Sequence, residues 1–168
     1  MHKKKAKQDK TNVMRLLEQH GVDYQAYYFP TKEALSGVQV AALLKEDPAR
    51  VFKTLVTVGS RTGEHFVFVI PVEKELDLKK AARAVGEKAI AMIHAKELLP
   101  LTGYIHGGCS PIGMKKFFRT TVDSSARDCG TIFFSAGRIG CQVETAPADL
   151  EKMIPLSYAA LTVEGGEA

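Results

Sequence analysis

The sequence predicts a single α+β domain, in which one mixed, curved, barrel-like β-sheet is flanked by short helices. Its length of 168 residues suits one domain with one core. Strand-like and helix-like segments are interspersed without regular β–α–β alternation, which argues against a doubly wound parallel sheet. The two strongest strand patterns, residues 51–58 and 65–71, are separated by a Gly-Ser-Arg-Thr-Gly segment typical of a hairpin turn.

The elements before this hairpin follow from periodicity and from turn residues. A helix is predicted over residues 12–20, because Val13, Leu16 and Leu17 recur at helical spacing and Gly21 follows as a stop. Aromatic and β-branched residues predict a strand over 22–29. A helix over 37–45 is then ended by Asp47-Pro48.

The segments after the hairpin alternate between short helices and strands. A helix is predicted over 78–85, closed by Gly86, followed by a short strand over 89–93 and a helical turn over 94–99. Further strands are expected over 117–122, 131–135 and 141–145, and a last helix over 147–153. The folded domain is placed at residues 11–160, between a basic disordered tail (1–10) and a C-terminal tail (161–168).

The net charge of +4 is confined to the N-terminus, where residues 1–10 hold five lysines and one aspartate. The rest of the chain is formally neutral. Any contact with nucleic acid from the body must therefore come from local basic clusters. The tail itself either adds an RNA contact or is a solvated segment without a role.

Several classes of protein are excluded by composition. The longest apolar run, residues 67–72, is far too short for a membrane span, and residues 1–10 lack the apolar core of a secretory signal. The three scattered cysteines, Cys109, Cys129 and Cys141, form no C-x-x-C pair, and the histidines form no metal-binding pattern. A cytoplasmic protein without membrane contact, metal or cofactor is expected.

Three local features are candidates for function. Residues 103–113 hold four glycines, whose backbone amides could bind an anion or stabilise an oxyanion, or simply form a tight turn. Lys53 interrupts an apolar strand, either as a fixed cation in a cleft or as a lysine that reaches water from a sheet edge. Residues 134–140 join two strands through a glycine turn, which is also typical of an ordinary hairpin.

Cys109 is a possible nucleophile, but a free cysteine is more often a small buried side chain.

Taken together, the sequence resembles the YbaK/EbsC family, which is related to the editing domain of bacterial prolyl-tRNA synthetases. The resemblance is carried, in family order and spacing, by residues 16–28, 52–55, 76–82, 102–104, 107–116 and 135–137. Two positions depart from the family pattern: a common tyrosine falls at Phe29, beside Tyr28, and an aspartate of some members falls at Gln142.

This resemblance implies a trans-editing deacylase that removes cysteine from Cys-tRNA(Pro) and from Cys-tRNA(Cys), with prolyl-tRNA synthetase as a candidate partner. The oligomeric state is left open. The implied catalytic residues are Lys53, Gly107, Gly108, Cys109 and Ser110, of which residues 107–110 offer backbone amides. The implied substrate-binding residues are Tyr28, Phe29, Thr54, Pro111, Gly113, Ser135, Ala136, Gly137 and Gln142. Lys115, Lys116 and Arg119 are the candidate tRNA contacts.

The family is thought to use the thiol of the substrate cysteine as the nucleophile, which would explain why no enzyme nucleophile is evident here. A thiol is intrinsically nucleophilic and a few per cent ionised near pH 7. Two alternatives stay open: a deacylase for alanine or another small residue that activates water, and a non-catalytic module that binds tRNA or a synthetase.

Overall fold

The computed structural model describes residues 10–164 and confirms the α+β class with a mixed sheet. The larger sheet has the order β4–β2–β3–β5–β8, with parallel pairing of β5 to both β3 and β8 and antiparallel pairing elsewhere. The smaller, antiparallel sheet has the order β1–β7–β6. The strands are β1 (Gln25–Tyr28), β2 (Phe52–Gly59), β3 (His65–Pro71), β4 (Ile90–Met92), β5 (Arg119–Asp123), β6 (Ile132–Arg138), β7 (Cys141–Thr145) and β8 (Ser157–Ala159).

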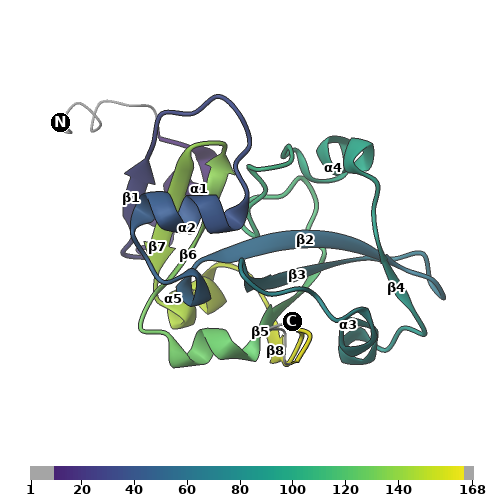
Figure 1. The fold of residues 1–168 in the computed structure, drawn as a ribbon. Helices are drawn as coiled ribbons and strands as arrows, with labels where there is room; N and C mark the ends of the chain where they lie inside the picture. Colours follow the sequence, from purple (N-terminus) through teal and green to yellow (C-terminus); the bar gives the residue numbers. More distant parts are fainter. Residues whose placement is uncertain (1–9, 165–168) are drawn as a thin grey trace.

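The predicted single barrel-like sheet is not found. The two sheets are connected by an isolated parallel bridge between Val51 and Phe133 rather than by a continuous ladder. They therefore meet at the start of β2 and do not close into a barrel. Figure 1 shows the smaller sheet beside the long β2–β3 pair, with helix α2 (Gly37–Leu44) running across the front of the smaller sheet.

Side-chain caps at Thr11, Ser36 and Asp77 mark where three of the helices begin. The helices are α1 (Asn12–Gln19), α2, α3 (Leu78–Val85), α4 (Ala95–Thr102) and α5 (Pro147–Met153), with short 3₁₀ turns at Pro48–Arg50 and Ser124–Asp128. Ser36 and Gln39 form a reciprocal capping box at the start of α2, and Asp77 accepts hydrogen bonds from the first amides of α3. The bounds predicted for β3, α3, β7 and α5 are confirmed, whereas β8 was not predicted.

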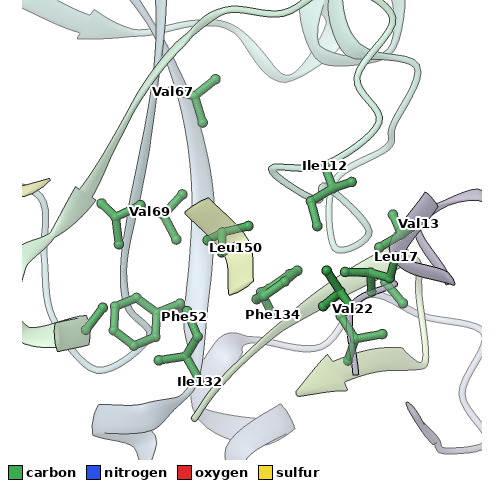
Figure 2. Close-up of a cluster of buried hydrophobic side chains, with 14 of the residues drawn as sticks. Val13, Leu17, Val22, Phe52, Val67, Val69, Ile112, Ile132, Phe134 and Leu150 are labelled. Carbon is green, nitrogen blue, oxygen red and sulfur yellow. The ribbon is translucent and has the colours of Figure 1, made fainter. Parts of the chain in front are cut away.

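The main core fills the space between α1, the smaller sheet and the inner face of β2–β3. Val13 and Leu17 of α1 lie against Phe134 of β6, while Phe52 of β2 lies near Ile132 (Figure 2). Complete burial of an apolar side chain of this size stabilises the fold by about 1.5–3 kcal/mol. A second cluster covers the other face of the larger sheet, where α3 packs on it; its fully or nearly fully buried members include Phe66, Phe68, Ile70, Ala81, Ala82 and Val85.

The C-terminal segment is part of the folded unit beyond residue 160. Leu161 is completely buried, and its amide donates to Asp123 Oδ1 at 2.9 Å while its carbonyl accepts from the amide of Asp77 at 2.8 Å. The amide of Val163 donates to the carbonyl of Glu75. The domain therefore reaches at least Val163. Of the predicted N-terminal tail, residues 1–9 lie outside the described part of the chain.

None of the helices formed between residues 10 and 164 combines the length and the apolar character needed to cross a membrane.

Candidate active site

A cavity of about 400 Å³ lies where the two sheets, α2 and the glycine loop (residues 103–113) come together. This volume is in the range of small-molecule sites, about 300–1,000 Å³. Predicted site residues from four segments line it: Lys53 and Thr54 on β2, Ser135 on β6, Gln142 on β7, and Gly107 and Cys109 on the glycine loop. The rest of the wall is formed by Leu35, Ser36, Gly37, Val40, Val51, Phe52, Leu55, Val72, Leu98 and His106.

Lys53 lies on β2 and lines this cavity together with neighbours from both faces of the strand. Phe52 and Val56 point into the main core, whereas Leu55 packs against the second cluster on the opposite face, as the sequence predicted. Lys53 is half-buried, and its amine forms no hydrogen bond or ion pair with any residue between 10 and 164. Burial lowers the pKa of Lys53, and the negative charge of Glu75 partly opposes this effect. The side chain is thus a cation available to a ligand.

Two buried polar atoms in the cavity wall lack partners. Neither Thr54 Oγ1 nor Gln142 Oε1 has a hydrogen bond within the described residues. A buried polar atom left unsatisfied costs about 1–3 kcal/mol, and native structures avoid this cost by supplying protein, water or ligand partners. Both residues line the cavity, so its wall contains two polar atoms whose hydrogen-bonding capacity the described residues leave unused.

Ser135 and Gln142 face each other across the β6–β7 pair as Cα partners. The Ser135 hydroxyl oxygen accepts a hydrogen bond from the amide of Gly137 at 3.0 Å, just where a β-bulge interrupts the register between Ser135 and Arg138. This bond fixes the serine rotamer, so the serine–glycine turn is an ordered part of the cavity wall.

The glycine loop is closed at its neck by hydrogen bonds. The amide of Lys115 donates to the carbonyl of Thr102 at 3.0 Å, and the hydroxyl of Tyr104 donates to the carbonyl of Ile112 at 2.5 Å. Inside the loop the amide of Gly108 donates to the carbonyl of Ile105 at 2.9 Å, which forms a tight turn. The loop is therefore held in one shape without a ligand.

The glycines allow this loop to pack directly on other backbone segments. Gly107 has a φ of +88°, and a β-carbon there would lie 2.6 Å from the β-carbon of Ala34. A β-carbon on Gly108 would lie 3.2 Å from the Cα of Arg138. The loop is therefore a tight structural turn that also forms part of the cavity wall, and anion or oxyanion binding by its amides remains a prediction.

Some backbone amides of this loop already donate a hydrogen bond within the protein, and others do not. The amide of Gly108, predicted as catalytic, is already bonded to Ile105, and Ser110 is completely buried and does not line the cavity. Neither residue therefore offers a free amide to the main cavity, and their catalytic role remains a prediction. The amides of Gly107 and Cys109 donate no hydrogen bond to any described residue, and both residues line the cavity.

Cys109 is unsuited to act as a nucleophile. Burial raises the pKa of its thiol to about 12, and a hydrogen bond with Thr102 opposes this only in part. The reactive form of cysteine is the thiolate. At neutral pH the side chain is a protonated thiol, so its contribution to the site is shape and the backbone amide.

Other predicted substrate-binding residues lie away from the cavity. Tyr28 and Phe29 line a separate cavity of about 390 Å³ with Arg138 and Gly140. Pro111 and Ala136 are buried and outside both walls. Gly113 and Gly137 pack against Tyr104, where added β-carbons would lie 2.9 Å from its hydroxyl oxygen and 3.0 Å from Cε1.

The predicted tRNA contacts point toward different elements. The Lys115 amine donates to the carbonyl of Pro100 in α4 at 3.2 Å, and the Lys116 amine lies 5.9 Å from the centre of the Phe118 ring. The guanidinium of Arg119 donates to the carbonyl of Val85, at the end of α3, at 3.3 Å. Lys115 and Arg119 therefore do not form one compact cluster, although all three side chains are exposed.

The sequence did not identify the part of the wall that α2 and the segment before it provide. Ser36, Gly37 and Val40 line the cavity, and a β-carbon on Gly37 would lie 2.4 Å from Val72 Cγ1. The capping pattern Ser36-x-x-Gln39 marks where this helix begins, but not which cavity it covers. His106 was not among the predicted site residues. It lines the cavity, and the described part of the chain contains no group of three His, Cys, Asp or Glu side chains that could hold a metal ion.

Comparison with known proteins assigns this chain to a family. The family model for the aminoacyl-tRNA editing domain matches residues 31–153. The chain belongs to the aminoacyl-tRNA editing domain family. The matched segment contains every residue that lines the main cavity, from Leu35 to Gln142, whereas Tyr28 and Phe29 precede it.

Relatives of this editing domain agree with the assignment. The chain is 48% identical over 162 residues to EbsC of Enterococcus faecalis, provisionally named a Cys-tRNA(Pro)/Cys-tRNA(Cys) deacylase, with 96% of this chain and 98% of EbsC covered. The crystal structure of the hypothetical protein APE2540 has the same fold, with a TM-score of 0.82 and 22% identity over 90% of this chain and 99% of that one. A protein described as a proposed trans-editing enzyme for prolyl-tRNA synthetase matches with a TM-score of 0.79 and 22% identity, over 92% and 99% of the two chains.

Proposed function

We propose that this chain is a cytoplasmic trans-editing deacylase that removes cysteine from Cys-tRNA(Pro) and Cys-tRNA(Cys). The observation that carries the proposal is the composition of the main cavity wall. It holds the half-buried amine of Lys53 and two polar atoms without partners, but no carboxylate and no ionised thiol. Such a wall can bind and orient an ester, yet it offers no evident nucleophile of its own.

The nucleophile is then best supplied by the substrate. A cysteine thiol has an ordinary pKa of about 8.5, so a small fraction is thiolate at neutral pH. The ammonium group of Lys53 favours the thiolate if the thiol binds beside it, because an opposite charge at short range lowers a pKa. A serine hydroxyl is hardly ionised under the same conditions, so the chemistry itself favours cysteine over serine.

The reaction proceeds in two steps. The thiolate sulfur attacks the ester carbonyl carbon of the same cysteine, the carbon–oxygen bond to the terminal ribose breaks, and the ribose oxygen takes up a proton. The cyclic thioester that forms is then opened by water, which gives free cysteine. The site accelerates the first step by holding sulfur and carbonyl in an attack geometry.

The developing oxyanion needs hydrogen-bond donors. The amides of Gly107 and Cys109 are available for this role, since both line the cavity and neither is engaged by a described residue. One such donor typically contributes about 10²–10³-fold in rate. Gln142 Oε1 has no partner within the described residues and can accept a hydrogen bond from the α-ammonium group of the aminoacyl moiety. Because glutamine is neutral, this contact lacks the negative charge that the aspartate of some family members would supply.

The rest of the tRNA must contact the surface outside the cavity. We propose that Lys115, Lys116 and Arg119 contribute separate phosphate contacts, since they lie on different parts of the surface. Few contacts imply modest affinity and a shallow salt dependence, with a slope of roughly −0.7 to −0.9 per phosphate. Such an enzyme would benefit from delivery of its substrate by prolyl-tRNA synthetase.

A second candidate function is the removal of alanine by activated water. It is favoured by His106, a residue of the cavity lining whose side chain is of the type that accepts a proton from water in general base catalysis. His106→Ala separates the two, because it would abolish a water-dependent reaction and leave a thiol-dependent one largely intact.

The direct test is a deacylation time course on Cys-tRNA(Pro), Cys-tRNA(Cys), Ala-tRNA(Pro) and Pro-tRNA(Pro). We expect the loss of cysteine from both tRNAs, with alanine and proline retained. Loss of alanine alone would support the second candidate. Retention of every amino acid, together with measurable tRNA binding, would show a non-catalytic module and overturn the proposal.

A further inference from the structure

A second hollow, of about 490 Å³, lies on the other side of Lys53. We call it the side groove; it is lined by Lys53, Leu55, Glu73, Lys74, Glu75, Leu76, Leu78, Met92 and Val163. Lys53 and Leu55 also line the main cavity, so the two spaces share a wall on β2. A molecule bound in the main cavity can therefore extend past Lys53 into the side groove.

The side groove has the chemistry of a site for a planar, uncharged ring. Leu78 and Met92 are large apolar side chains that are nevertheless 43% and 46% exposed. The charged groups around them balance: two lysines, Lys53 and Lys74, and two glutamates, Glu73 and Glu75. A neutral rim does not attract phosphate, but its carboxylates can accept hydrogen bonds from an amine or a hydroxyl group.

The side groove is held in shape by the C-terminal segment. The amide of Val163 donates to the carbonyl of Glu75 at 3.0 Å, and Leu76 forms an antiparallel bridge with Thr162. The segment between β3 and α3 is thus fixed by main-chain hydrogen bonds. A preformed groove binds a ligand without first having to order a loop.

We propose that the side groove binds the terminal adenosine of the tRNA, an inference that rests on the proposed deacylase function. The scissile ester is attached to the ribose of this nucleotide, so its base must lie in a space directly next to the main cavity. The faces of Leu78 and Met92 would support the adenine ring, and Glu73 or Glu75 would accept from its exocyclic amine or from a ribose hydroxyl.

The alternative space for this base is the cavity lined by Tyr28 and Phe29. That cavity and the main cavity have no lining residue in common. The side groove shares Lys53 and Leu55 with the main cavity, so it is the space directly next to the scissile ester.

The test combines a binding measurement with kinetics. AMP is titrated into the full chain with labelled methyl groups, and we expect shifts at Leu55, Leu78, Met92 and Val163. In Leu78→Ala/Met92→Ala, specificity for Cys-tRNA(Pro) over cysteine ethyl ester, which lacks a nucleoside, should fall on the order of tenfold. The matched control is Leu43→Ala on α2, which truncates a leucine that is 53% exposed and lines neither space.

Two results would overturn the assignment. One is AMP-induced shifts at Ile139 and Val40 in place of the side-groove methyl groups, or no shifts at all. The other is a double variant with the specificity of the parent chain. The AMP titration needs no turnover, so it tests the side groove even if the chain deacylates nothing and the proposed function fails.

Discussion

Gly108 lies against the backbone at Arg138, so closely that a β-carbon on the glycine would lie 3.2 Å from the arginine Cα. Two motifs that the sequence shows 30 residues apart, the glycine loop and the serine–glycine turn, therefore pack as one unit behind the cavity. The position of the Gly107 and Cys109 amides depends on this contact.

Gly108→Ala is accordingly expected to lower the deacylation rate more than it lowers stability. The added methyl group moves the loop by a few tenths of an ångström, which misaligns the proposed oxyanion donors; displacement of one such donor costs about 10²-fold. The measurement is the single-turnover rate on Cys-tRNA(Pro). Gly130→Ala is the matched control, because a β-carbon there meets nothing within 4 Å. Equal rates for the two variants would contradict this role of the loop.

Lys53→Met should reduce activity by on the order of 10²-fold through loss of the cation in the cavity. The same change is expected to increase the free energy of unfolding at pH 7. Burial holds the pKa of Lys53 below its ordinary value of 10.5, so the folded state is penalised while the amine is protonated. This penalty is full below the folded pKa and disappears as the pH rises toward 10.5.

The stability gain of Lys53→Met should therefore be largest at neutral pH and should shrink as the solution becomes alkaline. Urea unfolding at several pH values measures it, with Lys88→Met, an exposed lysine, as the control. A variant that is both fully active and no more stable than the parent would show that Lys53 merely reaches solvent from the edge of the sheet.

The triple variant Cys109→Ala/Cys129→Ala/Cys141→Ala is expected to retain deacylation of Cys-tRNA(Pro). Burial raises the pKa of Cys109 to about 12 and that of Cys141 to about 11, so neither is a thiolate at neutral pH. Cys141 is 1% exposed, and its truncation should cost about 1 kcal/mol of stability. Loss of turnover in a folded Cys109→Ala protein would instead identify an enzyme nucleophile.

Glu87 should make the stability of the β2–β3 hairpin sensitive to acid. Its carboxylate accepts hydrogen bonds from the hydroxyl of Thr62 and from the amide of Arg61, and these bonds, chiefly the one from Thr62, lower its pKa below 4.5. A depressed folded pKa adds stability above the unfolded value, and this stability is lost as the pH falls through the folded pKa.

Glu87→Gln should thus lower the free energy of unfolding at pH 7 and flatten its dependence on pH below about 4.5. Chemical denaturation between pH 7 and pH 3 measures both effects. Glu64→Gln, in the same hairpin but exposed, is the control. An unchanged acid profile in Glu87→Gln would contradict the role given to the Thr62 and Arg61 bonds.

The sequence predicts a helix or strand well when the residues that decide its bounds lie within or beside that element. The bounds of β3 followed from a short apolar run, and those of α3 from helical periodicity closed by Gly86, because the residues that decide them lie within or directly beside the element. The strand β8 could not be found in this way, since Ser157–Ala159 is too short to show a pattern and becomes a strand only by pairing with β5.

The same distinction between local and tertiary signals applies to the candidate site. Lys53 was identified because a charge within an apolar strand is a local anomaly. The division of the loop amides was not predictable, because it depends on which amide closes a turn, here Gly108 onto Ile105. The wall formed by α2 and the separation into two sheets are tertiary features, decided by contacts such as that of Gly37 with Val72.

The most direct test of the account compares Cys-tRNA(Pro) with S-methylcysteinyl-tRNA(Pro) in single-turnover deacylation by the unmodified chain. The methyl group leaves the shape of the amino acid nearly intact but removes the thiolate. The account predicts rapid loss of cysteine and loss of S-methylcysteine only at the spontaneous rate. Enzymatic rates that are similar for the two substrates would contradict it and would show that the enzyme activates water or a nucleophile of its own.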